Sequence, residues 1–261
     1  MSDSDSFMSH LIELKVRLTR ILIALLVVFG ALFYWARDIY TLLAEPMLAK
    51  LPPGTQMIAV EVASPFFVPI KVTMFAALII ALPYILYQIW AFVAPGLYSH
   101  EKKFVFPLIA TSTLLFVVGM AFAYFIVFPV VFKFITQFAP DGVAVMTDIQ
   151  KYFDFVLTLF LAFGVAFETP IVVVLLTRMG IVSIEQLKEA RPYVVVGAFV
   201  VAAIFTPPDV VSQLLLAFPL WLLYEMGLII SAWMGKPRKD EDADESKAKI
   251  EDKAESDTPA P

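Results

Sequence analysis

Six apolar segments, separated by shorter polar ones, dominate the pattern of hydrophobic and polar positions along the chain. They cover residues 19–36, 72–94, 108–132, 155–177, 193–206 and 210–230. A helix needs about 20 apolar residues to cross the hydrocarbon core of a bilayer, and most of these segments reach that length. The pattern therefore predicts an all-α integral membrane protein with six transmembrane helices.

The fifth apolar segment is shorter than a usual span. Its 14 residues, 193–206, would rise about 21 Å as a helix, whereas the hydrocarbon core is roughly 30 Å thick. We expect either a thinner bilayer beside this helix or shielding by neighbouring helices.

Lys and Arg residues are distributed unevenly over the segments that connect the apolar stretches. Of the 19 basic residues, 14 lie before the first stretch, in alternate connections after it and in the tail, and 5 lie on the opposite side. Basic residues accumulate on the cytoplasmic side of membrane proteins, so the distribution predicts that both termini are cytoplasmic.

Two polar end regions flank the predicted membrane domain of residues 19–235. Residues 7–18 carry apolar side chains at helical spacing and charged ones on a separate arc, which predicts an amphipathic cytoplasmic helix within residues 1–18. Residues 236–261 are mostly charged, with nine acidic side chains among the last 22 positions. This composition predicts a disordered acidic cytoplasmic tail.

Local signals predict how the connections fold. Residues 38–44 favour a short helix that ends before Glu45-Pro46, within a long segment expected to cap the outer ends of the spans. Thr147-x-x-Gln150 and Ser183-x-x-Gln186 have the capping-box pattern, which predicts helix starts at these two places.

Glu168 is the ionisable residue placed deepest in a predicted span, two residues before Pro170. A carboxyl group at mid-bilayer costs a few kcal/mol on insertion scales, so it should face a polar cavity or be protonated. The alternative is a neutral side chain bonded to a backbone carbonyl that Pro170 leaves free. Weaker polar signals, which more often tie helices together, are Gln88, Tyr124 and Gln213.

Two further acids lie near predicted span ends. Asp209, in TPPDVV, is expected to cap the sixth helix behind two prolines. Glu225 lies close enough to the cytoplasmic end of that helix to reach water.

Features of soluble enzymes are absent from the sequence. The chain has no cysteine, no glycine-rich phosphate loop and no H-E-x-x-H or G-x-S-x-G motif, and its two histidines lie in separate segments. We therefore expect no enzyme activity, no metal, no cofactor and no nucleic-acid partner.

The predicted cytoplasmic face carries two carboxylates beside basic and aromatic residues. Glu13 lies on the amphipathic segment, four residues before Arg17, and Glu101 lies in the short loop LYSHEKK. From spacing alone, Glu13 should pair with Arg17 and Glu101 should be solvated beside its lysine neighbours.

Five segments together resemble one known family: SHLIELKVRL, SPFFVPIKVT, LYQIWAFVAPGLYSHEKKFVFP, AFGVAFETPIVVVLL and RPYVVVGAFVVAAIFTPPD. They are similar, in this order and with similar spacing, to the TatC family, the receptor and core subunit of the twin-arginine protein translocase. The resemblance covers about Ser9 to Gly235. Lys15 departs from it, because the family has arginine there and lysine lacks the planar fork of a guanidinium.

The resemblance implies a function for residues that spacing leaves open. Glu13 and Glu101, with Phe92 and Arg17 beside them, would bind the paired arginines of a signal peptide. Residues implied to line a polar face or support the outer cap are Glu168, Gln213, Tyr124, Pro46 and Asp209.

The resemblance also implies an architecture, a location and partners. It implies a concave, glove-like bundle with short fifth and sixth spans, located in the bacterial inner membrane. The partners would be membrane lipid, TatA and TatB single-span subunits in a multimeric complex, and signal peptides of folded substrates. The proton-motive force would drive the export of those substrates.

Two other classes of function remain as alternatives. A proton-coupled small-solute transporter would use Glu168 as its coupling acid, but the sequence has no internal repeat. A membrane-embedded hydrolase would pair Glu168 with Glu225, but no nucleophile or metal motif accompanies them.

Overall fold

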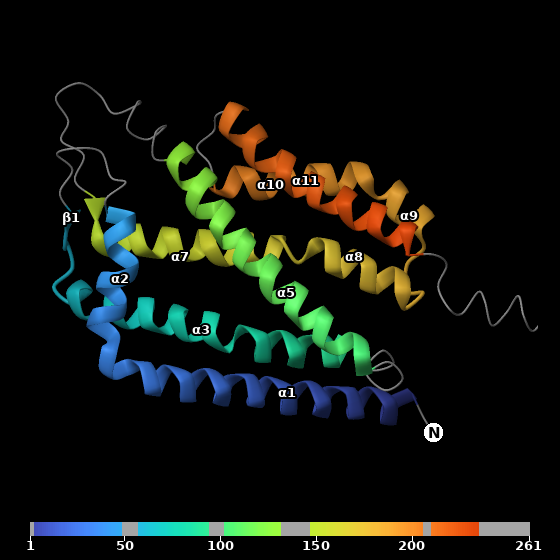
Figure 1. Ribbon diagram of the computed structural model, residues 1–261, viewed down its shortest axis with the longest axis horizontal. Coiled ribbons are helices and arrows are strands. Elements are labelled where there is room, and N and C mark those ends of the chain that lie inside the picture. The colour runs from blue at the N-terminus through green and yellow to red at the C-terminus, as the bar shows by residue number, and fades with distance from the viewer. Residues whose placement is uncertain (1–2, 49–56, 94–101, 132–146, 206–209, 235–261) are drawn as a thin grey trace, which may run out of the picture. The chain divides into compact units, whose positions relative to one another are not determined.

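The computed structural model describes residues 3–48, 57–93, 102–131, 147–205 and 210–234, and these residues are almost entirely helical (Figure 1). The chain divides into two compact units. Unit 1 comprises residues 1–167 and 203–213, and unit 2 comprises residues 168–202 and 214–261. The predicted all-α class is confirmed, apart from one pair of very short strands.

The described part of unit 1 is built around four long helices and the elements that connect them. Its elements are α1 (Asp3–Leu32), the 3-10 turn η1 (Phe33–Trp35), α2 (Ala36–Leu48), α3 (Ser64–Val93), α5 (Lys102–Phe122), the π-helical turn η2 (Ala123–Val127) and α7 (Ile149–Ala166). Helix α3 lies between α1 and α7, while α5 packs against both α3 and α7 (Figure 1). The residues of the predicted amphipathic helix, 7–18, are the first turns of the same helix that continues into the first apolar segment.

Two strands of unit 1 were not predicted. Strand β1 (Met57–Ile58) pairs in parallel with β2 (Thr147–Asp148), which joins the connection before α3 to the connection before α7. Strands of two residues are too short for an alternating pattern to reveal them.

Two local predictions in unit 1 are wrong. Helix α2 runs through Glu45-Pro46 to Leu48, because a proline in the last turns removes only one backbone hydrogen bond and its φ suits a helix. The N-cap of α7 is Asp148 and not Thr147: the Asp148 side chain accepts a hydrogen bond from the backbone N–H of Lys151.

Small residues bring α5 and α7 into close contact. A Cβ added at Gly119 would lie 2.5 Å from the backbone oxygen of Phe163, and one added at Gly164 would lie 2.6 Å from the ring of Phe116. Phe163 is 2% exposed and its ring lies 5.6 Å from that of Phe122. Part of the core of unit 1 is therefore an aromatic contact in which only glycine fits at positions 119 and 164.

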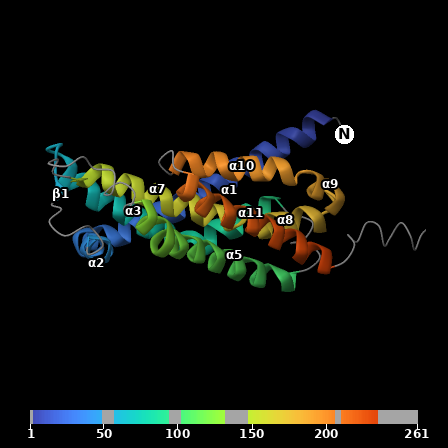
Figure 2. The same cartoon turned by 90° about the horizontal axis from the view of Figure 1, so that it is seen from above.

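The described part of unit 2 consists of four helices with a small core of their own. They are α8 (Thr169–Arg178), α9 (Ile184–Glu189), α10 (Arg191–Phe205) and α11 (Val210–Trp233), although the last residues of α10 and the first of α11 belong to unit 1. Figure 2 shows α9 as a short piece of helix between α8 and α10. The core packs Val173, Leu187, Tyr224 and Leu228 together, and the Tyr224 hydroxyl donates a 2.6 Å hydrogen bond to the Leu187 carbonyl.

Three predictions fall within the helices of unit 2. The capping box of Ser183 and Gln186 is present at the start of α9 and is confirmed. Helix α10 has 15 residues, which confirms a short fifth segment. The short sixth segment is wrong, because α11 has 24 residues and continues through Pro219 to Trp233.

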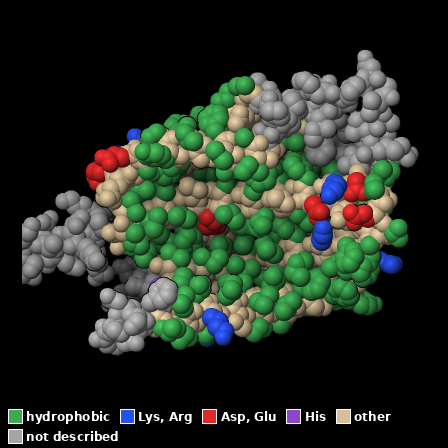
Figure 3. Space-filling view, turned by 180° about the vertical axis from the view of Figure 1, so that it is seen from behind, with side chains coloured by type: hydrophobic (Ala, Val, Ile, Leu, Met, Phe, Trp, Pro, Cys, Tyr) green, Lys and Arg blue, Asp and Glu red, His purple; other side chains and the backbone are tan. Residues whose placement is uncertain are grey.

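Five helical stretches in the described part of the chain are long and apolar enough to cross a membrane: residues 8–42, 64–93, 105–131, 149–178 and 216–233. Many large apolar side chains on these stretches are exposed, including Leu22 at 54% and Leu114 at 63%. Figure 3 shows a surface covered mostly by hydrophobic side chains, with the charged ones in a few small groups. A surface of this kind is expected to face lipid rather than water.

Candidate functional site

The first turns of α1 meet the last turns of α3 in unit 1. The ring of His10 lies 5.3 Å from the ring of Phe92, and the Arg17 guanidinium reaches Gln88. Residue numbers increase along α1 while their partners decrease along α3, so the two helices run antiparallel. Gln88 and Phe92 are four residues apart, which places both on the face of α3 that contacts α1.

Glu13 and Arg17 form an ion pair within this contact, as their spacing predicts. Arg17 donates from Nη2 and Nε to the same carboxylate oxygen, Oε1 of Glu13, at 2.7 and 2.9 Å. Arg17 also donates from Nη1 to the side-chain oxygen of Gln88, at 3.3 Å. The charge of Arg17 is therefore neutralised within α1, and its guanidinium is fixed to α3 as well.

The exposure of these side chains decides what the site can do. The Glu13 side chain is 36% exposed, the Arg17 side chain is 20% exposed and Gln88 is 3% exposed. Among the described residues, Oε2 of Glu13 accepts no hydrogen bond. A carboxylate in a partly exposed side chain, with one oxygen held by hydrogen bonds and the other accepting none among the described residues, can accept a guanidinium from a ligand.

Other residues predicted for this site lie outside what the structure describes. Glu101 and Asp209 fall in segments that are not described. Pro46 lies within α2, but its side chain belongs to the part that is not described. Their predicted roles stay predictions.

Glu168 marks the interruption between α7 and α8. It is the N-cap residue of α8, with Pro170 in the first turn, and it is 7% exposed. Pro170 thus lies in the first turn of a new helix, and the carboxyl group of Glu168 is buried. Tyr124 lies in η2 with its ring 4.8 Å from that of Phe125, and Gln213 lies near the start of α11.

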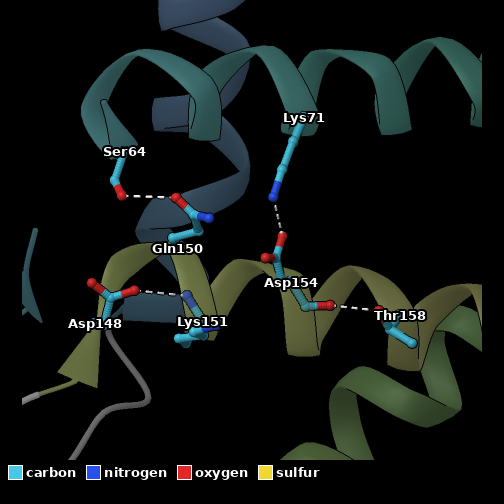
Figure 4. A network of polar contacts seen from close by, with 7 residues as sticks. All are labelled: Ser64, Lys71, Asp148, Gln150, Lys151, Asp154 and Thr158. Atoms are coloured by element: carbon cyan, nitrogen blue, oxygen red, sulfur yellow. Dashed lines mark hydrogen bonds and ion pairs between the residues drawn. The ribbon is translucent and has the colours of Figure 1, made fainter. Parts of the chain in front are cut away.

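Sequence reasoning missed a second polar cluster in unit 1, which joins the start of α3 to the start of α7 (Figure 4). The Ser64 hydroxyl donates a 2.8 Å hydrogen bond to the side-chain oxygen of Gln150. The Lys71 ammonium lies 2.7 Å from the Asp154 carboxylate, and both side chains are 42% exposed. Opposite charges near one end of two predicted spans were the only signal of this contact in the sequence.

Asp148 completes this cluster by joining the residues after β1 to the start of α7. Its carboxylate accepts hydrogen bonds from the backbone N–H of Lys151 at 2.9 Å and from that of Val60 at 3.0 Å. These two backbone donors, first Lys151 and then Val60, hold the pKa of Asp148 below its usual value. The polar groups of this cluster bond to one another and hold α3 and α7 together. We therefore interpret the cluster as structural rather than as a binding site.

In unit 2, Glu225 is held by a basic partner. Its carboxylate lies 2.7 Å from Nη2 of Arg191, with the Glu225 side chain 15% exposed. The pair ties the start of α10 to α11. In the part of the chain that the structure describes, no three His, Asp or Glu side chains are grouped as a metal site requires.

Comparison with known proteins identifies the family. Residues 9–219 match the family model described as Sec-independent protein translocase protein (TatC). The chain belongs to the TatC family. The TatC of Azotobacter chroococcum mcd 1 is 55% identical over 233 residues, which cover 88% of this chain and 91% of that protein. The TatC of Escherichia coli K12 is 53% identical over 243 residues, covering 93% and 94% of the two chains.

Solved TatC structures have the same fold. A crystal structure titled as the twin arginine translocase receptor TatC superposes with a TM-score of 0.73 at 42% identity, covering 86% of this chain and 98% of that one. A second crystal structure of the receptor, in DDM, gives a TM-score of 0.74 at 43% identity, covering 85% and 99%.

Family membership fixes the class of function. The chain is a membrane subunit of the twin-arginine translocase, it is not an enzyme, and it is located in the bacterial inner membrane. As a TatC subunit it works in a complex with other components of the translocase. The proton-coupled transporter and the membrane hydrolase find no support in these comparisons.

Proposed function

We propose that this TatC subunit recognises signal peptides with two adjacent arginines, and that Glu13 and Glu101 accept the two guanidinium groups. The observation that carries the proposal is the Glu13 carboxylate, which is partly shielded and has Oε2 available among the described contacts. Crystal structures of relatives are titled as the translocase receptor, which supports a recognition role for this chain.

Partial burial is what makes such a contact strong enough for recognition. Fully exposed ion pairs contribute about 0–1 kcal/mol, whereas hydrogen bonds to charged groups contribute about 1.5–3 kcal/mol when they are shielded. The contact between α1 and α3 supplies shielding near Glu13, because Arg17, which holds the carboxylate, is 20% exposed and bonds to buried Gln88. The hydrophobic stretch of a signal peptide would supply the rest.

The remaining residues have supporting roles in this proposal. Arg17 orients Glu13, and Phe92, whose ring lies 5.3 Å from that of His10, adds an apolar surface for the peptide. Glu168, Tyr124 and Gln213 are each polar-face residues by the family resemblance, and Glu168 acts after the peptide has bound. Pro46 and Asp209 support the outer cap.

We further propose the finer architecture that the apolar segments, the charge distribution and the family resemblance predict. The chain has six spans with both termini in the cytoplasm, and residues 1–18, 19–235 and 236–261 are the amphipathic start, the membrane domain and the tail. The membrane domain is a concave, glove-like bundle. The short α10, 15 residues long, supports a thinned bilayer wall at which TatA and TatB single-span subunits dock.

The recognition proposal is tested by a double-mutant cycle on the purified full-length chain. Affinity for a twin-arginine peptide is measured with each peptide arginine changed to lysine, in the wild type and in Glu13→Gln and Glu101→Gln. Direct pairing should give a coupling energy of about 1.5–3 kcal/mol between one carboxylate and one arginine. Losses that simply add, with no coupling, would refute the pairing.

A further inference from the structure

Gln88 is a polar side chain buried in an apolar helix, and the family-level function gives it no role. It is 3% exposed, and its neighbours Leu86 and Trp90 on α3 are each 5% exposed. Burying an amide costs free energy unless it forms hydrogen bonds. The side-chain oxygen of Gln88 accepts a hydrogen bond from Arg17, which lies 71 positions away in the chain.

Arg17 is held at two edges of its planar guanidinium group. Nη1 donates to Gln88, while Nε and Nη2 donate to Glu13. A pair at i,i+4 on one helix is a weak restraint by itself, because both side chains keep rotamer freedom. The contact with buried Gln88 removes that freedom from Arg17, since it fixes the guanidinium to a second helix.

The consequence is a fixed carboxylate at Glu13. Both hydrogen bonds from Arg17 converge on Oε1, and Oε2 accepts none among the described residues. A ligand guanidinium that approaches Oε2 then meets an acceptor whose direction is already set. Preorganisation of this kind increases affinity, because the ordering cost is met before the ligand binds.

We infer that Gln88 is a positioning residue of the receptor site: through Arg17 it orients Glu13 for the arginine of a signal peptide. The inference rests on the proposed recognition function and adds specificity to it. A planar fork needs a carboxylate of set direction, whereas the ammonium of lysine binds as a point charge. Gln88 therefore increases the preference for arginine over lysine without touching the peptide.

The test compares two synthetic signal peptides that differ only in having two arginines or two lysines. Binding to the full-length chain in nanodiscs is measured for the wild type and for Gln88→Met, which keeps the length of the side chain but has no oxygen acceptor. We expect Gln88→Met to weaken binding of the arginine peptide about tenfold, the effect of one charge-assisted hydrogen bond. Binding of the lysine peptide should change much less.

Three further variants separate positioning from general damage. Gln88→Glu keeps an acceptor of the same length and should restore the preference for arginine. The double variant Arg17→Lys, Gln88→Met should lose no more affinity for the arginine peptide than Arg17→Lys alone, because the two substitutions remove the same contact. Gln150→Met removes the bond from Ser64, another interhelical hydrogen bond of unit 1, and should leave both affinities unchanged.

The outcomes distinguish this inference from the function on which it rests. Equal weakening of both peptides, or tighter binding of the arginine peptide by Gln88→Met, would overturn the positioning role. The second result would mean that Arg17 competes with the peptide for Glu13. A wild type that binds both peptides equally would refute the recognition proposal and the positioning role with it. An unchanged Gln88→Met beside a weakened Glu13→Gln would refute only the positioning role.

Discussion

Three acidic side chains of this protein lie on largely apolar helices, and their surroundings differ. Glu13 is paired and partly exposed, Glu225 is paired with Arg191, and Glu168 is 7% exposed at a helix break. An acid buried in a membrane helix is costly, so its retention points to a use. At this scale the chemistry of the side chain decides the outcome of a substitution.

Glu168→Gln should reduce transport less than Glu168→Leu. Glutamine keeps the shape of the side chain and one oxygen acceptor, whereas leucine leaves the polar surroundings of the group unmatched. Export of a folded reporter with a twin-arginine signal is the measurement, with signal-peptide affinity measured in parallel. Affinity should stay at the wild-type level in both variants. Normal export by Glu168→Leu would contradict a role in the polar cavity.

Asp148 should make the stability of unit 1 depend on pH in the acidic range. Its pKa is lower in the folded state than its usual value, 3.8, so the charged form stabilises the fold. That contribution is complete above the usual value and is lost as pH falls through the folded pKa. Thermal unfolding in detergent is followed from neutral pH to about pH 3. The melting temperature of the wild type should fall more over this range than that of Asp148→Asn. Parallel curves would exclude this carboxylate as the source.

The helices of unit 1 depend on close approach more than on hydrophobic content. Helices α5 and α7 meet where Gly119 faces the backbone of Phe163, and α3 meets α7 at the cluster of Ser64, Gln150, Lys71 and Asp154. In lipid, apolar side chains gain little from leaving their surroundings, so packing and interhelical hydrogen bonds have to hold helices together.

Gly119→Ala should destabilise the protein by about 1–3 kcal/mol, the usual cost of overpacking a tight contact. The added Cβ would lie 2.5 Å from the carbonyl oxygen of Phe163, so backbone has to move. Gly30→Ala is the matched control, because nothing lies within 4 Å of the Cβ position there and the residue is also helical. Thermal melting of both variants in one detergent makes the comparison. Equal melting temperatures would show that α5 can shift without cost.

At the scale of the whole molecule, the apolar surface and the distribution of basic residues place the chain in the membrane. Five stretches of the described residues can span it, and α10 is a shorter apolar helix. The proposed topology puts α10 across a thinned bilayer as the fifth of six spans. It also puts both termini on the cytoplasmic side.

Single cysteines should report this topology without background, since the chain has none. Lys102→Cys and Lys188→Cys should react with a membrane-impermeant thiol reagent only in inverted vesicles. Val62→Cys, at a side chain 101% exposed after β1, should react in intact spheroplasts. Labelling of position 102 from the outer side would contradict the orientation.

Whether a contact could be predicted depended on how far apart its two residues lie in the sequence. The Glu13–Arg17 pair and the Ser183 capping box were predictable because their partners lie three or four residues apart. The end of α2 was predicted four residues too early and the N-cap of α7 one residue too early. Weak local signals compete at helix ends. The sixth apolar segment, predicted at residues 210–230, ends only three residues before α11 does at Trp233, and only the resemblance implied that it was short.

The sequence by itself determined membrane residence, helical class, family and the helices that carry Glu13 and Glu168. These follow from composition, from periodicity and from motifs that lie within one segment. Only the tertiary structure decided three long-range contacts. They are the hydrogen bond from Arg17 to Gln88, the ion pair of Lys71 with Asp154, and the hydrogen bond from the backbone of Val60 to Asp148. These partners are 71, 83 and 88 positions apart. Contacts at such separations exist only once helices have packed, because neither side chain alone specifies which distant partner it will meet.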